Sequence, residues 1–238
     1  MKQLLLIGSS IFNNGAYLSH CTEALKKFLG HMEKDEIIAF VPYALNNWDA
    51  HTLRVKKYFD TIGYRIESVH RSSEAQSLLN YKKVKAVFVG GGNTFLLKDQ
   101  FEAKKILASI YIGVKTGVFK YVGLGAGAIM PCPTIKTTND MPIICPSSFE
   151  SLGLIDYQIN PHFVSDKLIP VYAGERRETR IREFHEHCNT PVVGLPEGGW
   201  ITVNGDESIL CGTENAVIFR PNRNNTLWLP GEPFKSEG

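Results

Sequence analysis

The feature that most constrains the fold is a regular alternation of short apolar segments with amphipathic segments along the first half of the chain. Five segments are apolar and short enough for buried strands: residues 3–7, 36–41, 64–69, 85–89 and 120–123. Helical spacing of apolar residues marks residues 16–31, 49–62, 73–80, 94–100 and 102–116. Such alternation predicts βαβ units, in which a parallel sheet is covered by helices on both faces. We therefore expect an α/β fold with a mostly parallel central sheet.

The pattern changes after residue 157. One amphipathic helix is predicted over residues 176–187, and short strands are predicted near 191–195, 199–203, 207–211 and 215–219. These strands predict a C-terminal antiparallel edge on the same domain. Because no linker or low-complexity run interrupts the 238 residues, we expect one domain over residues 1–230 and a loose tail over residues 231–238.

Charge and cysteine usage narrow the possible partners. The formal net charge is only +2, and the basic residues are scattered except for a cluster at Arg176, Arg177, Arg180 and Arg182. This balance predicts neither nucleic-acid nor anionic-membrane binding, and no apolar run approaches the roughly 20 residues of a membrane span. The five cysteines are odd in number and lack C-x-x-C spacing, which indicates buried reduced thiols in a cytoplasmic protein.

Residues 121–128 have the layout of a nucleophile elbow, G-x-S-x-G, with glycine at the nucleophile position. The motif runs from Gly123 to Gly127, and Gly125 stands where a serine would project from a strained strand-to-helix turn. The same glycines, with Ala128, satisfy the dinucleotide fingerprint G-x-G-x-x-G/A. We reject that reading because the motif lies mid-chain and residues 140–150 form a proline-broken loop instead of a strand with an acidic end. A tight turn without function remains an alternative.

Polar residues follow several other apolar segments. They occur in Gly90–Thr94, in Asn160–Phe163 and in Leu195–Gly198. In an open α/β sheet, the loops at the carboxyl ends of the strands meet at one crevice, so these segments are predicted to lie together. A single histidine or glutamate is more often structural than functional, and only their combination is informative.

Together these segments resemble the peptidase E family of α-aspartyl dipeptidases, serine hydrolases on a flavodoxin-like scaffold related to class I glutamine amidotransferases. The resemblance spans nearly the whole chain. It is carried by residues 40–44, 90–95, the elbow, 137–143, 159–162, 174–181 and 194–198. It implies a three-layer sandwich and hydrolysis of dipeptides with N-terminal aspartate.

The resemblance assigns roles to individual residues. His162 matches the general base, and Glu197 matches the acid that orients it. Gly125 stands at the position of the serine nucleophile. The oxyanion hole would consist of backbone N–H groups of Gly91 or Gly92 together with Ala126.

The substrate is expected to be a small acidic dipeptide, and no metal or cofactor is expected. Arg177 matches the family arginine predicted to bind the substrate carboxylate, although it also fits an exposed helix face. Asn139 and Asp140 are candidates for binding the substrate ammonium or for bracing the elbow, and a structural role in their loop is an equal alternative. Asn93 and Thr94 are further substrate-binding candidates. The resemblance is compatible with a monomer or a homodimer.

The chain departs from the commonest family elbow, G-W-S-A-G-A-N, at Leu124, Gly125 and Ile129, and it has Arg176 where the family usually has threonine. Without the serine we expect little or no activity, and Cys132 lies too far along the chain to replace it. The glycine fits either an engineered knockout or a natural pseudoenzyme that binds aspartyl peptides. Retention of His162 and Glu197 favours recent or deliberate loss, whereas the other departures favour divergence. A cyanophycinase-like hydrolase of another acidic amide is a further alternative.

Overall fold

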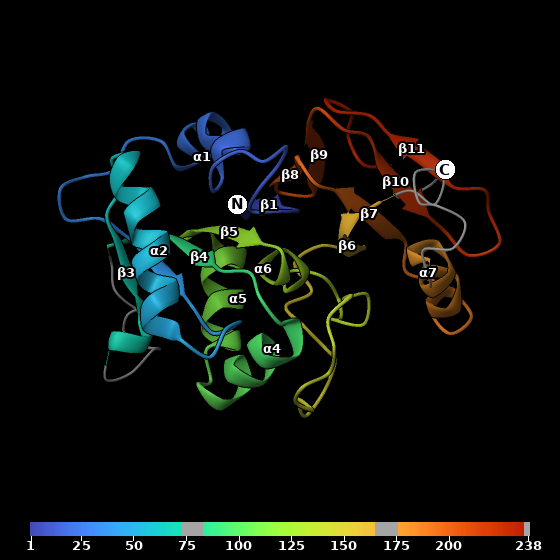
Figure 1. Ribbon diagram of the computed structural model, residues 1–238, viewed down its shortest axis with the longest axis horizontal. Coiled ribbons are helices and arrows are strands. Elements are labelled where there is room, and N and C mark those ends of the chain that lie inside the picture. The colour runs from blue at the N-terminus through green and yellow to red at the C-terminus, as the bar shows by residue number, and fades with distance from the viewer. Residues whose placement is uncertain (73–82, 165–175, 236–238) are drawn as a thin grey trace.

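The computed structural model describes residues 1–72, 83–164 and 176–235, and its centre is a seven-stranded sheet (Figure 1). The strand order is β3-β2-β4-β5-β1-β8-β9. The neighbours from β3 to β1 pair in parallel, β8 pairs antiparallel to β1, and β9 pairs antiparallel to β8. The strands are β1 (Gln3–Ile7), β2 (Ile37–Val41), β3 (Ile66–Ser68), β4 (Val84–Val89), β5 (Lys120–Leu124), β8 (Gly199–Asn204) and β9 (Glu207–Gly212). The predicted mostly parallel sheet with a C-terminal antiparallel edge is confirmed.

Helices cover both faces of this sheet, which gives three layers. The described helices are α1 (Thr22–Leu29), α2 (Trp48–Thr61), α4 (Thr94–Ala103), α5 (Leu107–Thr116), α6 (Ala126–Ile129) and α7 (Arg177–His185). Successive strand residues point to opposite faces: Leu5 and Ile7 pack with the residues of α1 and α2, whereas Leu4 and Leu6 pack with those of α4 and α5. The near-continuous apolar strands of the sequence follow from this burial on both faces.

The C-terminal strands also build a second sheet, which the sequence did not predict. Its order is β11-β10-β7-β6, with β6 (Gln158–Phe163), β7 (Val192–Pro196), β10 (Ala216–Phe219) and β11 (Thr226–Trp228). Of the four strands predicted after residue 190, two join the central sheet and two join this one. No strand was predicted at β6, which lies at the edge of this sheet, where a proline such as Pro161 is tolerated.

Two predicted helices have different limits from those expected. The helix expected over residues 102–116 begins at Leu107, because α4 extends to Ala103 and Lys105 adopts a left-handed φ of 54° that separates the two helices. The helix expected over residues 16–31 is confined to Thr22–Leu29 between Leu18 (φ 55°) and Gly30 (φ 69°). The helix expected over residues 73–80 lies outside the described residues.

The described part of the predicted loose tail, residues 231–235, packs against the domain. Phe234 donates its N–H to the carbonyl of Ser208 at 2.7 Å, and its ring centroid lies 4.4 Å from that of Tyr157. All five cysteines are free thiols, but only Cys21 and Cys132 are buried, so the expectation of buried thiols holds for those two alone.

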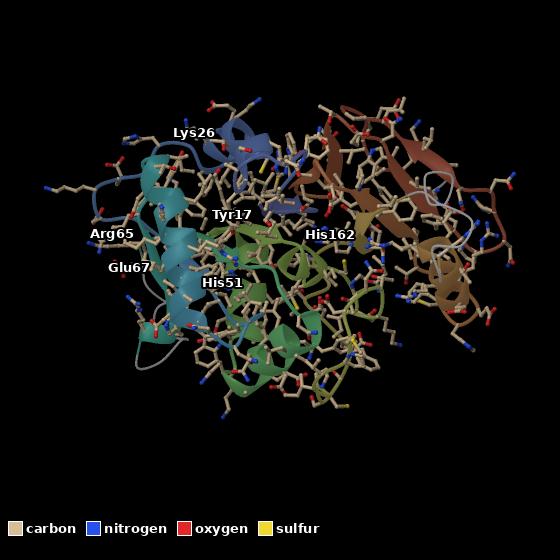
Figure 2. All side chains as sticks on the ribbon, in the orientation of Figure 1. Tyr17, Lys26, His51, Arg65, Glu67 and His162 are labelled. Atoms are coloured by element: carbon tan, nitrogen blue, oxygen red, sulfur yellow. The ribbon has the colours of Figure 1, made fainter. Side chains whose placement is uncertain are left out.

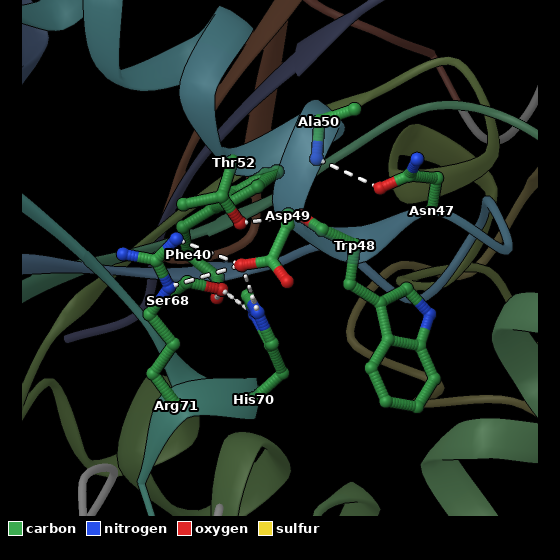
Figure 3. A network of polar contacts seen from close by, with 9 residues as sticks. All are labelled: Phe40, Asn47, Trp48, Asp49, Ala50, Thr52, Ser68, His70 and Arg71. Atoms are coloured by element: carbon green, nitrogen blue, oxygen red, sulfur yellow. Dashed lines mark hydrogen bonds and ion pairs between the residues drawn. The ribbon is translucent and has the colours of Figure 1, made fainter.

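A polar network fastens the first turn of α2 to the edge of the sheet (Figure 3). The Asp49 carboxylate accepts hydrogen bonds from Arg71 Nη2 at 2.7 Å and lies 3.3 Å from His70 Nε2. His70 Nδ1 lies 2.6 Å from Ser68 Oγ, which in turn donates to the Phe40 carbonyl at 3.3 Å. This row of Asp, His and Ser side chains ties α2 to β3 and, through the Phe40 carbonyl, to β2.

The turn between β5 and α6 is packed against β4 at backbone distance. A Cβ atom on Gly123 would lie 2.3 Å from the Gly127 carbonyl oxygen, and one on Gly127 would lie 2.2 Å from the Val89 carbonyl oxygen. Tyr121 reinforces the turn because its hydroxyl donates to the Gly127 carbonyl at 2.7 Å. These two glycines are therefore required by packing, whatever the function of the turn.

Replacing either glycine with alanine should destabilise the protein. We expect Gly123→Ala and Gly127→Ala each to lower the free energy of unfolding by about 1–3 kcal/mol or more, because backbone atoms must move apart. Gly153→Ala is the matched control: its Cβ meets no atom within 4 Å, and only its positive φ of 58° opposes the substitution, at about 1 kcal/mol. Equal losses in urea denaturation for all three variants would contradict the close packing.

Candidate active site

Gly125 occupies the strained turn between β5 and α6. Its φ of 53° and ψ of −109° are rarely adopted by residues with a side chain. Its N–H donates to the Ile7 carbonyl at 3.0 Å, which ties the turn to β1. A Cβ atom built on Gly125 would lie 3.9 Å from His162 Nε2, without a clash. A serine hydroxyl, one bond farther out, would come within hydrogen-bonding reach of that nitrogen.

His162 and Glu197 are adjacent because β6 and β7 pair in parallel and their carboxyl ends coincide. Nδ1 of His162 lies 3.0 Å from Oε1 of Glu197. Since a carboxylate only accepts, the Nδ1 position carries the proton and Nε2, which faces Gly125, can act as an acceptor in the neutral ring. The second sheet thus supplies the pair, and the central sheet supplies the elbow (Figures 1 and 2).

A bulge in β6 aims His162 out of its sheet. The register with β7 shifts between Pro161 and Phe163, and His162 has a left-handed φ of 54°. Side chains hold the bulge: Arg177 Nη1 donates to the Pro161 carbonyl at 2.9 Å and also to that of His162. Asn139 Nδ2 donates to the Pro161 carbonyl at 3.1 Å. Arg177 and Asn139 are thus engaged in placing the imidazole.

The glycine loop after β4 presents unpaired backbone donors. Gly90 donates to Val41 and Asn93 donates to Ala44, whereas within the described residues no hydrogen bond uses the N–H of Gly91 or Gly92. Gly92 has a φ of 143°, and its Cβ would lie 2.3 Å from the Ala44 carbonyl oxygen, so only glycine fits. The Ala126 N–H, at the first position of α6, has no helical partner either.

These features surround one cavity of about 460 Å³. Its described lining residues are Ser10, Tyr17, Leu45, His51, Arg54, Gly91, Gly92, Thr94, Leu124, Gly125, Ala126, Ile129, Thr138, Asn139, Asp140, Pro161, His162 and Arg177. Nine of the eleven predicted site residues are in this set; Asn93 and Glu197 are not. A larger cavity of about 720 Å³, between α7 and residues 219–225, contains none of the predicted residues.

Three of the predicted substrate-binding residues mainly support the loop before β6. Asp140 Oδ2 accepts from the Thr94 N–H at 2.7 Å and from the hydroxyls of Thr94 and Thr138. Asn93 caps α4 by accepting from Leu96 N at 3.0 Å. Asp140 and Thr94 still line the cavity, and the bonds between them also join the loop to the start of α4, as in the structural role that the sequence left open for Asp140.

Sequence reasoning did not single out five polar residues that line the cavity: Ser10, Tyr17, His51, Arg54 and Thr138. His51 is buried, and its Nδ1 lies 3.2 Å from the Pro42 carbonyl. Burial lowers the pKa of His51 to about 4, so the ring is neutral at neutral pH with Nε2 as an acceptor. The guanidinium of Arg54 lies 5.9 Å from the ring centroid of Tyr17. Helical spacing predicted α2, but no motif distinguishes its cavity-facing residues.

The structure offers no substitute for the missing hydroxyl in Cys132. This thiol is fully buried, burial raises its pKa, and it does not line the cavity. The described residues contain no group of three or more His, Cys, Asp or Glu side chains arranged to hold a metal ion. No helix among them has both the length and the apolar character needed to cross a membrane.

The protein has a mostly parallel sheet covered by helices, and a strained turn that lies beside a His–Glu pair. This combination is typical of α/β hydrolases of the serine type. The comparisons with known proteins identify the family within that class. The model of peptidase family S51 matches residues 4–211. The chain therefore belongs to peptidase family S51, a family of serine-type dipeptidases, and it has a dipeptidase scaffold.

Similar proteins occur in distant organisms. Peptidase E of Streptomyces coelicolor is 40% identical over 217 residues, covering 91% of this chain and 87% of that protein. A protein of Drosophila melanogaster described as a probable alpha-aspartyl dipeptidase is 36% identical over 219 residues, covering 92% and 90%. The crystal structure of a peptidase from an acI-B1 actinobacterium covers 98% of this chain and 96% of its own, with a TM-score of 0.70 at 17% identity, which supports the fold.

The strained backbone at Gly125 has a measurable consequence. We expect Gly125→Ser and Gly125→Ala each to lower the free energy of unfolding by about 1–3 kcal/mol, because a side chain must adopt the positive φ. The two losses should be similar, since the Cβ causes the strain and the cavity accommodates the hydroxyl. A melt in which Gly125→Ser is clearly more stable than the parent chain would contradict a strained elbow.

The buried His51 predicts an acid-sensitive stability. Its pKa is about 4 in the folded state and near 6.5 when unfolded, so the unfolded state binds a proton first and stability falls as the pH decreases from about 6.5 to 4. A shift of this size corresponds to at most about 3 kcal/mol. In His51→Gln, the free energy of unfolding measured by urea titration should fall less between pH 6.5 and 4 than it does in the parent chain. Substitution of the exposed His31 with Gln serves as the control, and an equally reduced fall there would contradict the assignment.

Proposed function

We propose that this chain has the active site of a dipeptidase for Asp-Xaa substrates, complete except for the nucleophile. The observation that carries the proposal is the 3.9 Å between the Cβ position at Gly125 and His162 Nε2. A serine placed at residue 125 would therefore face the acceptor nitrogen of His162, as a nucleophile must face its general base. The proposed roles are His162 as general base, Glu197 as its orienting acid, and Gly125 as the nucleophile position.

In a Gly125→Ser chain, the chemistry follows from these positions. His162 Nε2 takes the hydroxyl proton as the oxygen attacks the scissile carbonyl, and the imidazolium that forms is stabilised by Glu197 at Nδ1. The N–H groups of Gly91 or Gly92, together with Ala126, stabilise the oxyanion. His162 then returns the proton to the leaving amine, and water repeats the sequence on the acyl group.

The preference for N-terminal aspartate is proposed from the charges of the cavity and from one relative, described as a probable alpha-aspartyl dipeptidase. Arg177 lies beside His162, where a guanidinium can bind the aspartyl carboxylate. Asp140 contributes the negative charge that an N-terminal ammonium requires. Asn93, Thr94 and Asn139 are proposed to hold these groups in place.

The second candidate function is binding without cleavage by a natural pseudoenzyme. It is favoured by the departures at Leu124 and Ile129, which an engineered Ser→Gly change does not explain. Both line or adjoin the cavity while leaving it open. A cytoplasmic location stays a prediction for either candidate.

The Gly125→Ser variant tests the catalytic proposal. We expect it to hydrolyse Asp-Leu in preference to Glu-Leu and Leu-Leu. The parent chain and Gly125→Ala should hydrolyse Asp-Leu at least about 10³-fold more slowly than the serine variant. Adding His162→Ala to the serine variant should remove most of the gain. If the serine variant cleaves none of the three dipeptides, or cleaves them without preference for aspartate, the proposed function is wrong.

A further inference from the structure

A second guanidinium reaches the cavity from the side opposite to Arg177. Arg54 projects from α2, whereas Arg177 begins α7, and the elbow between β5 and α6 lies between these two helices (Figure 1). In Figure 2, Tyr17 and His51, which line the cavity together with Arg54, lie to the left of His162. A bound dipeptide whose scissile carbonyl lies at Gly125 would therefore have one arginine on each side.

Arg54 is an exposed residue that lines the cavity, and no carboxylate of the described residues neutralises it. Its guanidinium lies 5.9 Å from the centroid of the Tyr17 ring, a cation–π distance. Within the described residues, no hydrogen bond or ion pair engages Arg54. The network around Asp49 fixes the first turn of the same helix to the sheet edge (Figure 3), so the base of this side chain is anchored.

The charges of the cavity mirror those of an aspartyl dipeptide. Apart from His162, the charged residues among its described lining are Arg54, Asp140 and Arg177, and burial keeps His51 neutral. They comprise two positive groups and one negative group. Asp-Xaa with a neutral second residue has two carboxylates and one ammonium. If Arg177 binds the aspartyl side chain, the remaining carboxylate, at the C-terminus of the dipeptide, has Arg54 as its counterpart.

We infer that Arg54 binds the C-terminal carboxylate of the substrate and so restricts the site to dipeptides. The inference rests on the proposed function and adds to it the residue that distinguishes dipeptides from longer peptides. A longer peptide carries a neutral amide at that point and leaves the guanidinium without its partner, which costs affinity.

The chain itself is suited to the test, because Gly125 allows binding to be measured without turnover. We would titrate Asp-Leu and Asp-Leu amide by calorimetry into the parent chain, Arg54→Ala, Arg54→Lys and Lys57→Ala. Lys57 is an exposed cation on the same helix that does not line the cavity, so its removal controls for long-range charge. Asn-Leu serves as the matched ligand that lacks the aspartyl carboxylate.

We expect the parent chain to bind Asp-Leu on the order of tenfold more tightly than the amide, the range of one charge-assisted hydrogen bond. The preference should fall to within about twofold in Arg54→Ala, persist in part in Arg54→Lys, and be unchanged in Lys57→Ala. Discrimination against Asn-Leu should survive in Arg54→Ala, since it depends on Arg177.

The two possible failures are distinguishable. If Asp-Leu binds in preference to Asn-Leu but Arg54→Ala keeps the full preference over the amide, the role of Arg54 is wrong and the proposed function stands. If Asp-Leu does not bind the folded parent chain at millimolar concentration, the proposed function fails and the inference fails with it. If Lys57→Ala also loses the preference for Asp-Leu over the amide, the preference comes from the overall charge of the protein, and the assignment to Arg54 is wrong.

Discussion

The structure of the site depends on the close approach of backbone to backbone where β5 turns into α6. Gly123 and Gly127 lie so near the carbonyls of Gly127 and Val89 that no side chain fits at either position. This contact sets the strained backbone of Gly125 and fixes the direction in which a side chain there would point. That direction leads to His162 Nε2. The turn therefore keeps the geometry of a nucleophile elbow although the nucleophile itself is absent.

The position of the imidazole on the other side of the cavity depends on a bulge in a strand. His162 sits on a bulge of the second sheet, in a left-handed conformation that needs support from outside the strand. Arg177 supplies that support through the carbonyls of Pro161 and His162, and Glu197 orients the ring. Two sheets that meet at their carboxyl ends thus hold two strained residues face to face. Such strain persists only where the surroundings determine it, which is typical of functional sites.

Much of the fold was predictable because it follows from local patterns. Apolar strands and helical spacing gave β1 to β5 and α2 within one or two residues, and glycine spacing gave the elbow. The second sheet was not predictable, since its first strand contains Pro161 and its pairing joins segments about 35 residues apart. In the site, His162 and Glu197 were identified by motif. Arg54 and His51 were missed, because their contribution arises only when α2 is folded beside the glycine loop.

The measurement that tests most directly whether one atom is missing is the affinity for a boronic acid analogue of aspartate. A boronate forms a tetrahedral adduct with a serine hydroxyl and so engages the nucleophile, the base and the oxyanion donors together. We expect it to bind Gly125→Ser at least about 100-fold more tightly than the parent chain, and the gain to disappear when His162→Ala is added. Equal affinity for Gly125→Ser and the parent chain would contradict the view that the site is complete but for its nucleophile.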